Sequence, residues 1–92
     1  MSEYQRHKIV KWRTGYRFQF EKSQNKHVIL YPEGMIQLNE SAGLIGELIN
    51  NQRTGQDIIV SIQSQFPNVP EIEQDIDDFM NVAFQQHWIE FQ

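Results

Sequence analysis

The apolar residues of this 92-residue chain change their spacing near Asn39. Before this point apolar and polar residues alternate, most clearly from Tyr16 to Glu21, which is the period of a half-buried strand. After it apolar residues recur every three or four positions, which is typical of amphipathic helices. A two-residue alternation does not give a helix an apolar face, and a three- to four-residue spacing does not give a strand one. We therefore expect strands in the first half and helices in the second. The sequence therefore predicts an α+β fold.

Three short strands are expected, over residues 16–21, 27–31 and 35–38. The polar stretch 22–26 between the first two has the length of a hairpin loop. The next connection is Tyr-Pro-Glu-Gly, residues 31–34, which places Pro and Gly where a β-turn favours them. Consecutive strands joined by such short turns form an antiparallel meander.

Three helices are expected after the strands. The first follows Asn39, a favourable N-cap residue. The second follows Thr54, with Asp57 in the position of the acidic residue of a capping box, and it stops at Pro67. The third opens at Pro70, since a first helical turn tolerates a residue without an N–H. Three strands followed by three helices predict a winged-helix-like architecture.

The chain is long enough for one hydrophobic core, because 39% of its 92 residues are apolar. Residues 1–15 have no sustained period and end in Thr-Gly, so we expect a flexible basic N-terminal segment there. A single domain is expected over residues 16–92. The sequence has no cysteine and no apolar run as long as a membrane span or a signal peptide, so we expect a cytoplasmic protein without membrane association.

Positive and negative charges lie at opposite ends of the chain. Seven of the eight Lys and Arg residues fall within residues 1–26, whereas ten of the twelve Asp and Glu residues come later, five of them within residues 71–78. A DNA-binding winged helix needs positive charge on its docking helix to neutralise phosphates. The acidic third helix therefore argues against a nucleic-acid partner, and a winged-helix DNA-binding regulator remains the alternative function.

No set of residues in the sequence indicates catalysis. His7, His27 and His87 lack the spacing of metal ligands. The acids of residues 71–78 point in several directions around a helix and are typical of charges that stabilise a helix start. The chain also lacks a phosphate-binding Gly-rich loop and a G-x-S-x-G motif. We expect no enzyme activity, no metal site and no cofactor.

The third predicted strand, Met35–Leu38, is short, uncharged and at a sheet edge. Alternation turns Ile36 and Leu38 inward and leaves Met35 and Gln37 pointing the other way. No Lys or Pro within the strand blocks further pairing. Such an edge is either protected by its brevity or used by a ligand peptide that adds a strand. The residues alone leave both possibilities open.

The segment His27–Ala42 carries a family resemblance. Its run V-I-L-Y-P-E-G-M-I-Q-L-N-E-S-A resembles the V-L-L-Y-P-E-G-x-x-x-L-N-x-x-A pattern of the PqqD family of pyrroloquinoline quinone biosynthesis proteins. The similarity extends from about residue 9 to the end of the chain. Two features depart from the family. Asn-Asn-Gln at residues 50–52 replaces a common Asp-Gly, and the basic segment before Gly15 is less well matched.

The resemblance implies a peptide chaperone that binds the precursor peptide PqqA by strand addition and presents it to the radical S-adenosylmethionine enzyme PqqE. In recognition elements of this class the peptide pairs with the third strand and lies beside the third helix. The chaperone itself carries no cofactor. We expect a monomer, or a weak or swapped dimer. Carried onto this chain, the implied peptide-binding residues are Met35, Ile36, Gln37, Leu38, Asp75, Asp78, Phe79 and Val82.

Overall fold

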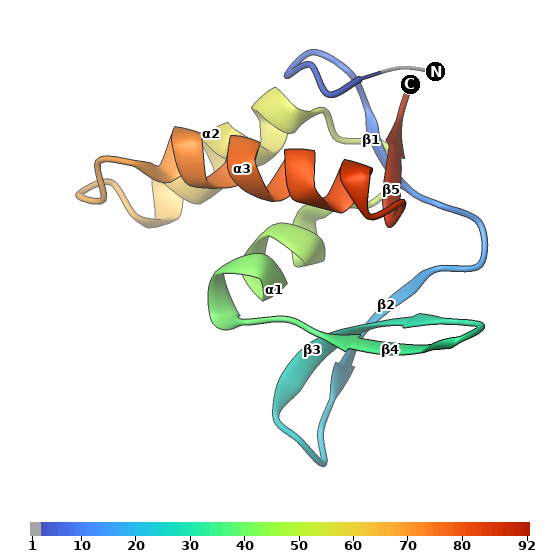
Figure 1. The fold of residues 1–92 in the computed structure, drawn as a ribbon. Helices are drawn as coiled ribbons and strands as arrows, with labels where there is room; N and C mark the ends of the chain where they lie inside the picture. The colour runs from blue at the N-terminus through green and yellow to red at the C-terminus, as the bar shows by residue number, and fades with distance from the viewer. Residues whose placement is uncertain (1–2) are drawn as a thin grey trace.

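The computed structural model describes residues 3–92 and contains two antiparallel sheets and three helices (Figure 1). The elements in chain order are β1 (Val10–Trp12), β2 (Arg17–Glu21), β3 (Lys26–Tyr31), β4 (Gly34–Gln37), α1 (Glu40–Leu48), α2 (Gly55–Gln65), α3 (Ile72–Gln85) and β5 (Ile89–Phe91). This arrangement confirms the predicted α+β class, with a three-stranded antiparallel sheet followed by three helices.

The three-stranded sheet has the order β2-β3-β4, as a meander requires. The β2–β3 connection includes Asn25, which has a φ of 54° and belongs to one of the few residue types that tolerate left-handed backbone. The β3–β4 turn closes where Tyr31 pairs with Gly34. Strands β2 and β4 are therefore the two edges, and β4 runs directly into α1 (Figure 1).

Helix α1 packs closely on this sheet because two of its residues are glycines. A Cβ atom at Gly43 would overlap the ring of His27, and one at Gly46 would overlap the ring of Phe18. The Phe18 ring is itself held between two others, with ring centroids 5.4 Å from Trp12 and 5.3 Å from His27. The small residues thus set the distance between α1 and the strands that precede it.

Side-chain caps define two of the helix starts. The Asn39 side chain accepts a hydrogen bond from the backbone amide three residues later at 2.8 Å. Thr54 and Asp57 form a reciprocal capping box with two bonds of 3.0 Å, as the sequence predicted. Helix α3 begins at Ile72 rather than at Pro70 and has no side-chain cap.

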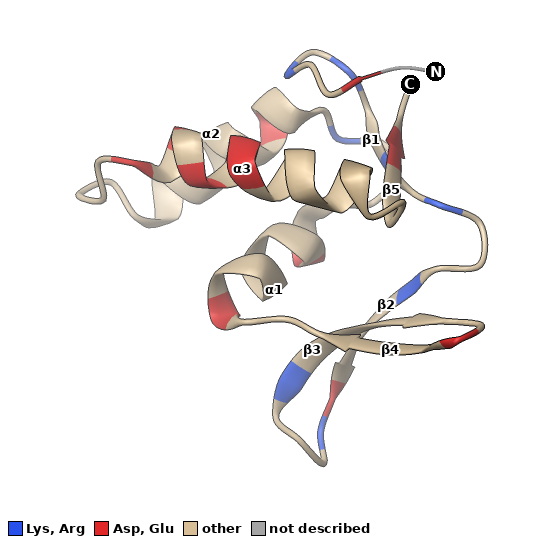
Figure 2. Cartoon of the chain, in the orientation of Figure 1, with Lys and Arg blue, Asp and Glu red and all other residues tan. Residues whose placement is uncertain are grey.

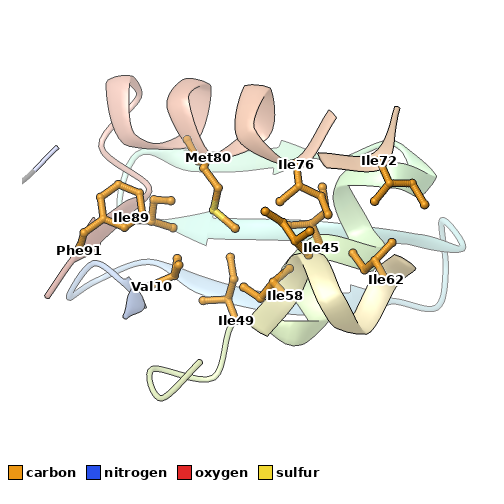
Figure 3. Packing of buried hydrophobic residues seen from close by; sticks show 12 residues of the cluster. Val10, Ile45, Ile49, Ile58, Ile62, Ile72, Ile76, Met80, Ile89 and Phe91 are labelled. Atoms are coloured by element: carbon orange, nitrogen blue, oxygen red, sulfur yellow. The ribbon is translucent and has the colours of Figure 1, made fainter. Parts of the chain in front are cut away.

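The main hydrophobic core lies among the three helices and the small β1–β5 sheet (Figure 3). Helix α3 contributes one apolar stripe at three- and four-residue spacing, as expected for an amphipathic helix. Residues 3–92 include no helix with both the length and the apolar character that a membrane span requires. The buried cluster consists of Val10, Ile45, Ile49, Ile58, Ile59, Ile62, Ile72, Ile76, Met80, Ala83, Ile89 and Phe91.

Strand β1 lies inside the segment 1–15 that we expected to be flexible. Val10 is completely buried and pairs with Phe91 of β5. Regular structure therefore begins at Val10, which corrects the expectation that it begins at Tyr16. A three-residue strand is too short to show a period, and its partner lies at the other end of the chain, so the sequence pattern did not reveal it. Met1 and Ser2 lie outside the described residues.

Candidate functional site

The free edge of β4 carries main-chain groups at two residues. The Leu38 N–H donates a hydrogen bond to the His27 carbonyl oxygen at 2.9 Å, so these residues form a hydrogen-bonded pair. Hydrogen-bonded pairs alternate along an antiparallel ladder, so Ile36 also bonds toward β3. Met35 and Gln37 lie between these positions and direct their N–H and C=O groups to the open edge.

The side chains of β4 follow the predicted alternation in exposure. Met35 is 42% exposed and Gln37 is exposed, whereas Ile36 is half-buried and Leu38 is 7% exposed. The Gln37 amide nitrogen donates a hydrogen bond to the side-chain oxygen of Gln24 in the β2–β3 turn. Of the four residues that the family resemblance implies on the third predicted strand, Met35 and Gln37 are therefore accessible, whereas Leu38 follows the end of β4 and has a buried side chain.

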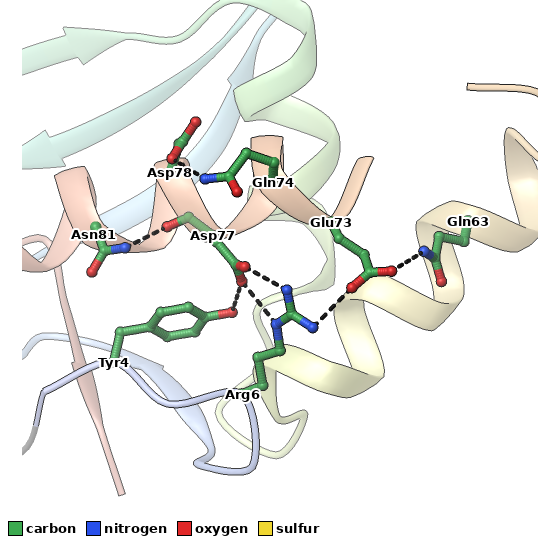
Figure 4. A network of polar contacts seen from close by, with 8 residues as sticks. All are labelled: Tyr4, Arg6, Gln63, Glu73, Gln74, Asp77, Asp78 and Asn81. Atoms are coloured by element: carbon green, nitrogen blue, oxygen red, sulfur yellow. Dashed lines mark hydrogen bonds and ion pairs between the residues drawn. The ribbon is translucent and has the colours of Figure 1, made fainter. Parts of the chain in front are cut away.

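The four implied residues of α3 have different surroundings. Phe79 is half-buried against the core, whereas Val82 is 50% exposed. Asp78 accepts a hydrogen bond from Gln74 at 2.8 Å (Figure 4). Asp75 is exposed, and no side-chain hydrogen bond or ion pair within residues 3–92 involves its carboxylate. This face of α3 thus combines apolar surface with two negative charges that have no ion-pair partner within residues 3–92, of which only Asp78 accepts a side-chain hydrogen bond.

A pocket of about 200 Å³ opens where the three helices meet. Asp75 is the one residue from the expected binding set that lines it. No sequence pattern predicted this pocket, although Phe66 and Val69 on either side of Pro67 are apolar residues in a connection where polar ones are usual. The lining residues are Ser41, Leu44, Ile45, Ile62, Phe66, Val69, Ile72, Asp75 and Ile76.

Two other acids of α3 hold the N-terminal segment in place (Figure 4). Arg6 bridges them, with its guanidinium nitrogens 2.6 Å from Asp77 Oδ2 and 2.8 Å from Glu73 Oε2. The Tyr4 hydroxyl donates a hydrogen bond to Asp77 Oδ1 at 2.7 Å. We call these four residues the N-terminal clamp. Because Glu73 and Asp77 already have partners in it, they are less available to a ligand than Asp75.

The clamp changes the protonation equilibria of its members. Partial burial acts to raise the pKa of Asp77, but hydrogen bonds from Arg6 and Tyr4 and the charge of Arg6 outweigh it and hold this pKa below its usual range. Burial and the hydrogen bond to Asp77 raise the pKa of the Tyr4 phenol. The hydrogen bond to Asp77 likewise raises the pKa of Arg6. Asp77 is therefore a charged structural residue at neutral pH.

His27 and His87 have structural surroundings. His27 lies against the rings of Phe18 and Phe20, and its Nε2 atom is 2.7 Å from Glu47 Oε1. His87 has a φ of 67° in the turn after α3. Within the described part of the chain, no three His, Asp or Glu side chains gather in a way that could hold a metal ion.

The charged side chains are unevenly distributed over the fold. Figure 2 shows acidic residues along the first half of α3, whereas basic residues follow the N-terminal segment, β1 and the start of β2. Helix α3 itself has no Lys or Arg. DNA phosphates would be repelled by this helix, so the charge distribution opposes the DNA-binding alternative.

Comparisons with known proteins point to one family. The family model described as Coenzyme PQQ synthesis protein D (PqqD) matches residues 26–89. A PqqA binding protein of Pseudomonas entomophila is 57% identical over 86 residues, which covers 94% of both chains. A PqqA binding protein of Pseudomonas syringae pv. tomato is 58% identical over 80 residues, which covers 87% of this chain and 82% of the relative.

A solved structure supports the same relationship. The fold is similar to the solution NMR structure of the PqqD truncation of Methylobacterium extorquens PqqCD, with a TM-score of 0.77 and 25% sequence identity. The match covers 96% of this chain and 95% of that chain. That truncation represents a functional, stand-alone recognition element for ribosomally synthesized and post-translationally modified peptides.

Proposed function

Because this chain belongs to the PqqD family, we propose that it is a peptide chaperone of pyrroloquinoline quinone biosynthesis that binds the precursor peptide PqqA. The peptide adds as a further strand to β4 and lies beside α3. The chaperone then presents it to the radical S-adenosylmethionine enzyme PqqE and carries out no chemistry itself. The names of the relatives support the peptide ligand, and the open edge of β4 supports the mode of binding.

The observation that carries this proposal is the outward direction of the Met35 and Gln37 main-chain groups. An added strand satisfies these groups without any change in the β3–β4 register. Each such bond contributes about 0.5–1.5 kcal/mol after the exchange with water. The four main-chain groups of these two residues therefore contribute about 2–6 kcal/mol, which offsets at most the low end of the ~4–15 kcal/mol that association costs in translational and rotational freedom. Side-chain contacts must therefore supply much of the affinity.

Exposed side chains on β4 and on α3 provide apolar contacts of the required kind. Met35 on the strand and Val82 on α3 are large apolar residues with about half of their surface exposed, 42% and 50% respectively. Burying such a side chain from full exposure contributes about 1.5–3 kcal/mol, so covering the exposed half of each contributes roughly half of that. Met35 also adapts to different partner shapes, since its side chain is unbranched. Phe79 is already half-buried and adds a smaller increment.

The acids contribute to selectivity more than to affinity. Asp75 has no partner within residues 3–92, whereas Asp78 already accepts a hydrogen bond from Gln74. Ion pairs between exposed groups contribute about 1 kcal/mol or less and weaken in salt. A basic residue of the peptide near Asp75 would therefore favour one placement of the peptide over others.

A backbone NMR titration with synthetic PqqA tests the proposal. We expect shift changes at Met35–Leu38 and along the outer face of α3, with a scrambled peptide as the control. Hydrogen exchange sharpens the test, because the Met35 and Gln37 amides should gain protection on binding while the Leu38 amide is already bonded to His27. Unchanged β4 amides at saturating peptide would rule out strand addition.

Presentation to PqqE requires a separate experiment. We expect PqqE to modify PqqA faster when this protein is present, and we expect no modified peptide from this protein and PqqA alone. Modified product formed without PqqE would contradict the chaperone role.

The oligomeric state is tested separately. Analytical ultracentrifugation with and without peptide distinguishes the expected monomer from a weak or swapped dimer.

A further inference from the structure

We infer that the pocket between α1, α2 and α3 is a second contact site of the bound peptide, which receives one large apolar side chain next to a basic residue. This inference rests on the proposed peptide-binding function and extends it beyond the β4 edge. It assigns the pocket to the segment of peptide that continues past the end of β4.

The pocket is apolar and open, which suits a side chain from another molecule. Leu44, Phe66 and Val69 all line it and are 40%, 40% and 48% exposed. Apolar side chains gathered in one hollow are a recurring mark of binding surfaces, because water there is readily displaced. The volume of about 200 Å³ exceeds the ~150 Å³ of an apolar cavity known to hold benzene. One Leu, Ile or Phe side chain therefore fits.

The pocket continues the path of the β4 edge. Gln37 ends β4, Asn39 caps α1, and Ser41 in the first turn of α1 lines the pocket. An extended peptide advances about 3.3 Å per residue. A peptide paired with Met35 and Gln37 and running in the direction of α1 therefore reaches the pocket within a few residues.

The charge at the pocket rim favours a basic residue next to the apolar residue in the bound peptide. Among residues 3–92, Asp75 is the only charged residue that lines the pocket, and its carboxylate has no partner within this range. The nearby acids Glu73 and Asp77 are paired with Arg6. A Lys or Arg beside the apolar residue meets this charge, whereas a second copy of this acidic helix would add repulsion.

Paired substitutions of opposite charge at one pocket residue test the inference. Leu44→Lys and Leu44→Asp both place a charge among apolar side chains, while Val60→Lys and Val60→Asp make the same changes on α2 at a 54% exposed residue outside the pocket. Calorimetry with synthetic PqqA should show affinity about tenfold or more weaker for both Leu44 variants. Both Val60 variants should remain within about twofold of wild type.

An alanine scan of the apolar residues of PqqA identifies the side chain that enters. The alanine variant of that residue should weaken binding to wild type but add little to the effect of Leu44→Lys, since the two changes remove the same contact. Val69→Lys provides a second pocket variant outside the helices, and thermal unfolding checks that each variant is folded. If the effect of every alanine substitution in the peptide adds fully to the effect of Leu44→Lys, the inference is overturned.

The outcomes separate this inference from the proposed function. If wild type binds PqqA with shift changes at Met35–Leu38 and both Leu44 variants bind equally well, the pocket inference fails and strand addition stands. Weakening by Leu44→Lys alone would indicate a purely electrostatic effect and would also refute the apolar contact. If wild type does not bind PqqA, both proposals fail.

Discussion

The Leu38 amide donates a 2.9 Å hydrogen bond to the His27 carbonyl oxygen and thereby determines which main-chain groups of β4 remain open. Because bonded and non-bonded pairs alternate, Met35 and Gln37 become the two residues that face the free edge. The same alternation exposes their side chains. One register thus supplies both the backbone and the side-chain surface to which we assign the peptide.

A proline at position 37 tests the role of the open edge. Gln37→Pro removes an N–H that β3 does not use, so the sheet should tolerate it, as edge strands do. The loss of the donor and the added ring should weaken PqqA binding by about tenfold in calorimetry. Gln37→Ala is the matched control, because it removes the bond to Gln24 but keeps the N–H. Equal affinities of the two variants would contradict pairing at this residue.

The burial of Val10 predicts that the N-terminal segment stabilises the fold. Val10→Ala should lower the free energy of unfolding by about 2 kcal/mol, because it leaves a small cavity opposite Phe91. Lys11→Ala on the neighbouring residue should change it by less than about 0.5 kcal/mol. Urea unfolding followed by circular dichroism provides both values. A Val10 variant as stable as the Lys11 variant would mean that β1 contributes little to stability.

The contact of Gly46 with Phe18 predicts a steric effect. A methyl group at this position overlaps the ring of Phe18, which stacks with both Trp12 and His27, so Gly46→Ala should cost about 1–3 kcal/mol. Gly34→Ala is the comparison, since a methyl group there meets only Tyr31, at an ordinary contact distance of 3.6 Å. Thermal unfolding of both variants measures the difference. A smaller effect at Gly46 than at Gly34 would be inconsistent with the close approach of α1.

The clamp predicts a pH dependence of stability. The folded pKa of Asp77 is lower than its unfolded value of about 4, so its contribution is present above that value and is lost as pH falls through the folded pKa. Arg6 is 41% exposed, so solvent screening limits this contribution to about 1 kcal/mol. The unfolding free energy of Asp77→Asn should therefore decrease less steeply than that of wild type as the pH falls below about 4.

Denaturant titrations at several acidic pH values measure how the unfolding free energy depends on pH. Asp78→Asn removes a negative charge from the same helix without touching Arg6 or Tyr4, and so controls for net charge. If the unfolding free energies of wild type and Asp77→Asn depend on acidic pH in the same way, the Asp77 carboxylate does not stabilise the fold through the clamp.

The elements that local patterns encode were predictable from the sequence. The alternation around Phe18 indicated β2, the Pro-Gly turn at residues 31–34 indicated the β3–β4 hairpin, and Thr54 with Asp57 indicated a capped helix. The exposure pattern from Met35 to Leu38 followed from the same alternation. These features depend on residues within a few positions of one another, and short-range backbone and side-chain preferences determine them.

The sequence by itself therefore determined the order and type of the main elements, the α+β class and the unguarded character of the third predicted strand. The tertiary structure alone decided that β1 pairs with β5, that Arg6 occupies Glu73 and Asp77 while Asp75 remains unpaired, and that three helices enclose an apolar pocket. These relationships join residues far apart in the chain. Their stability comes from burial and from charge pairing across that separation, which no local period records.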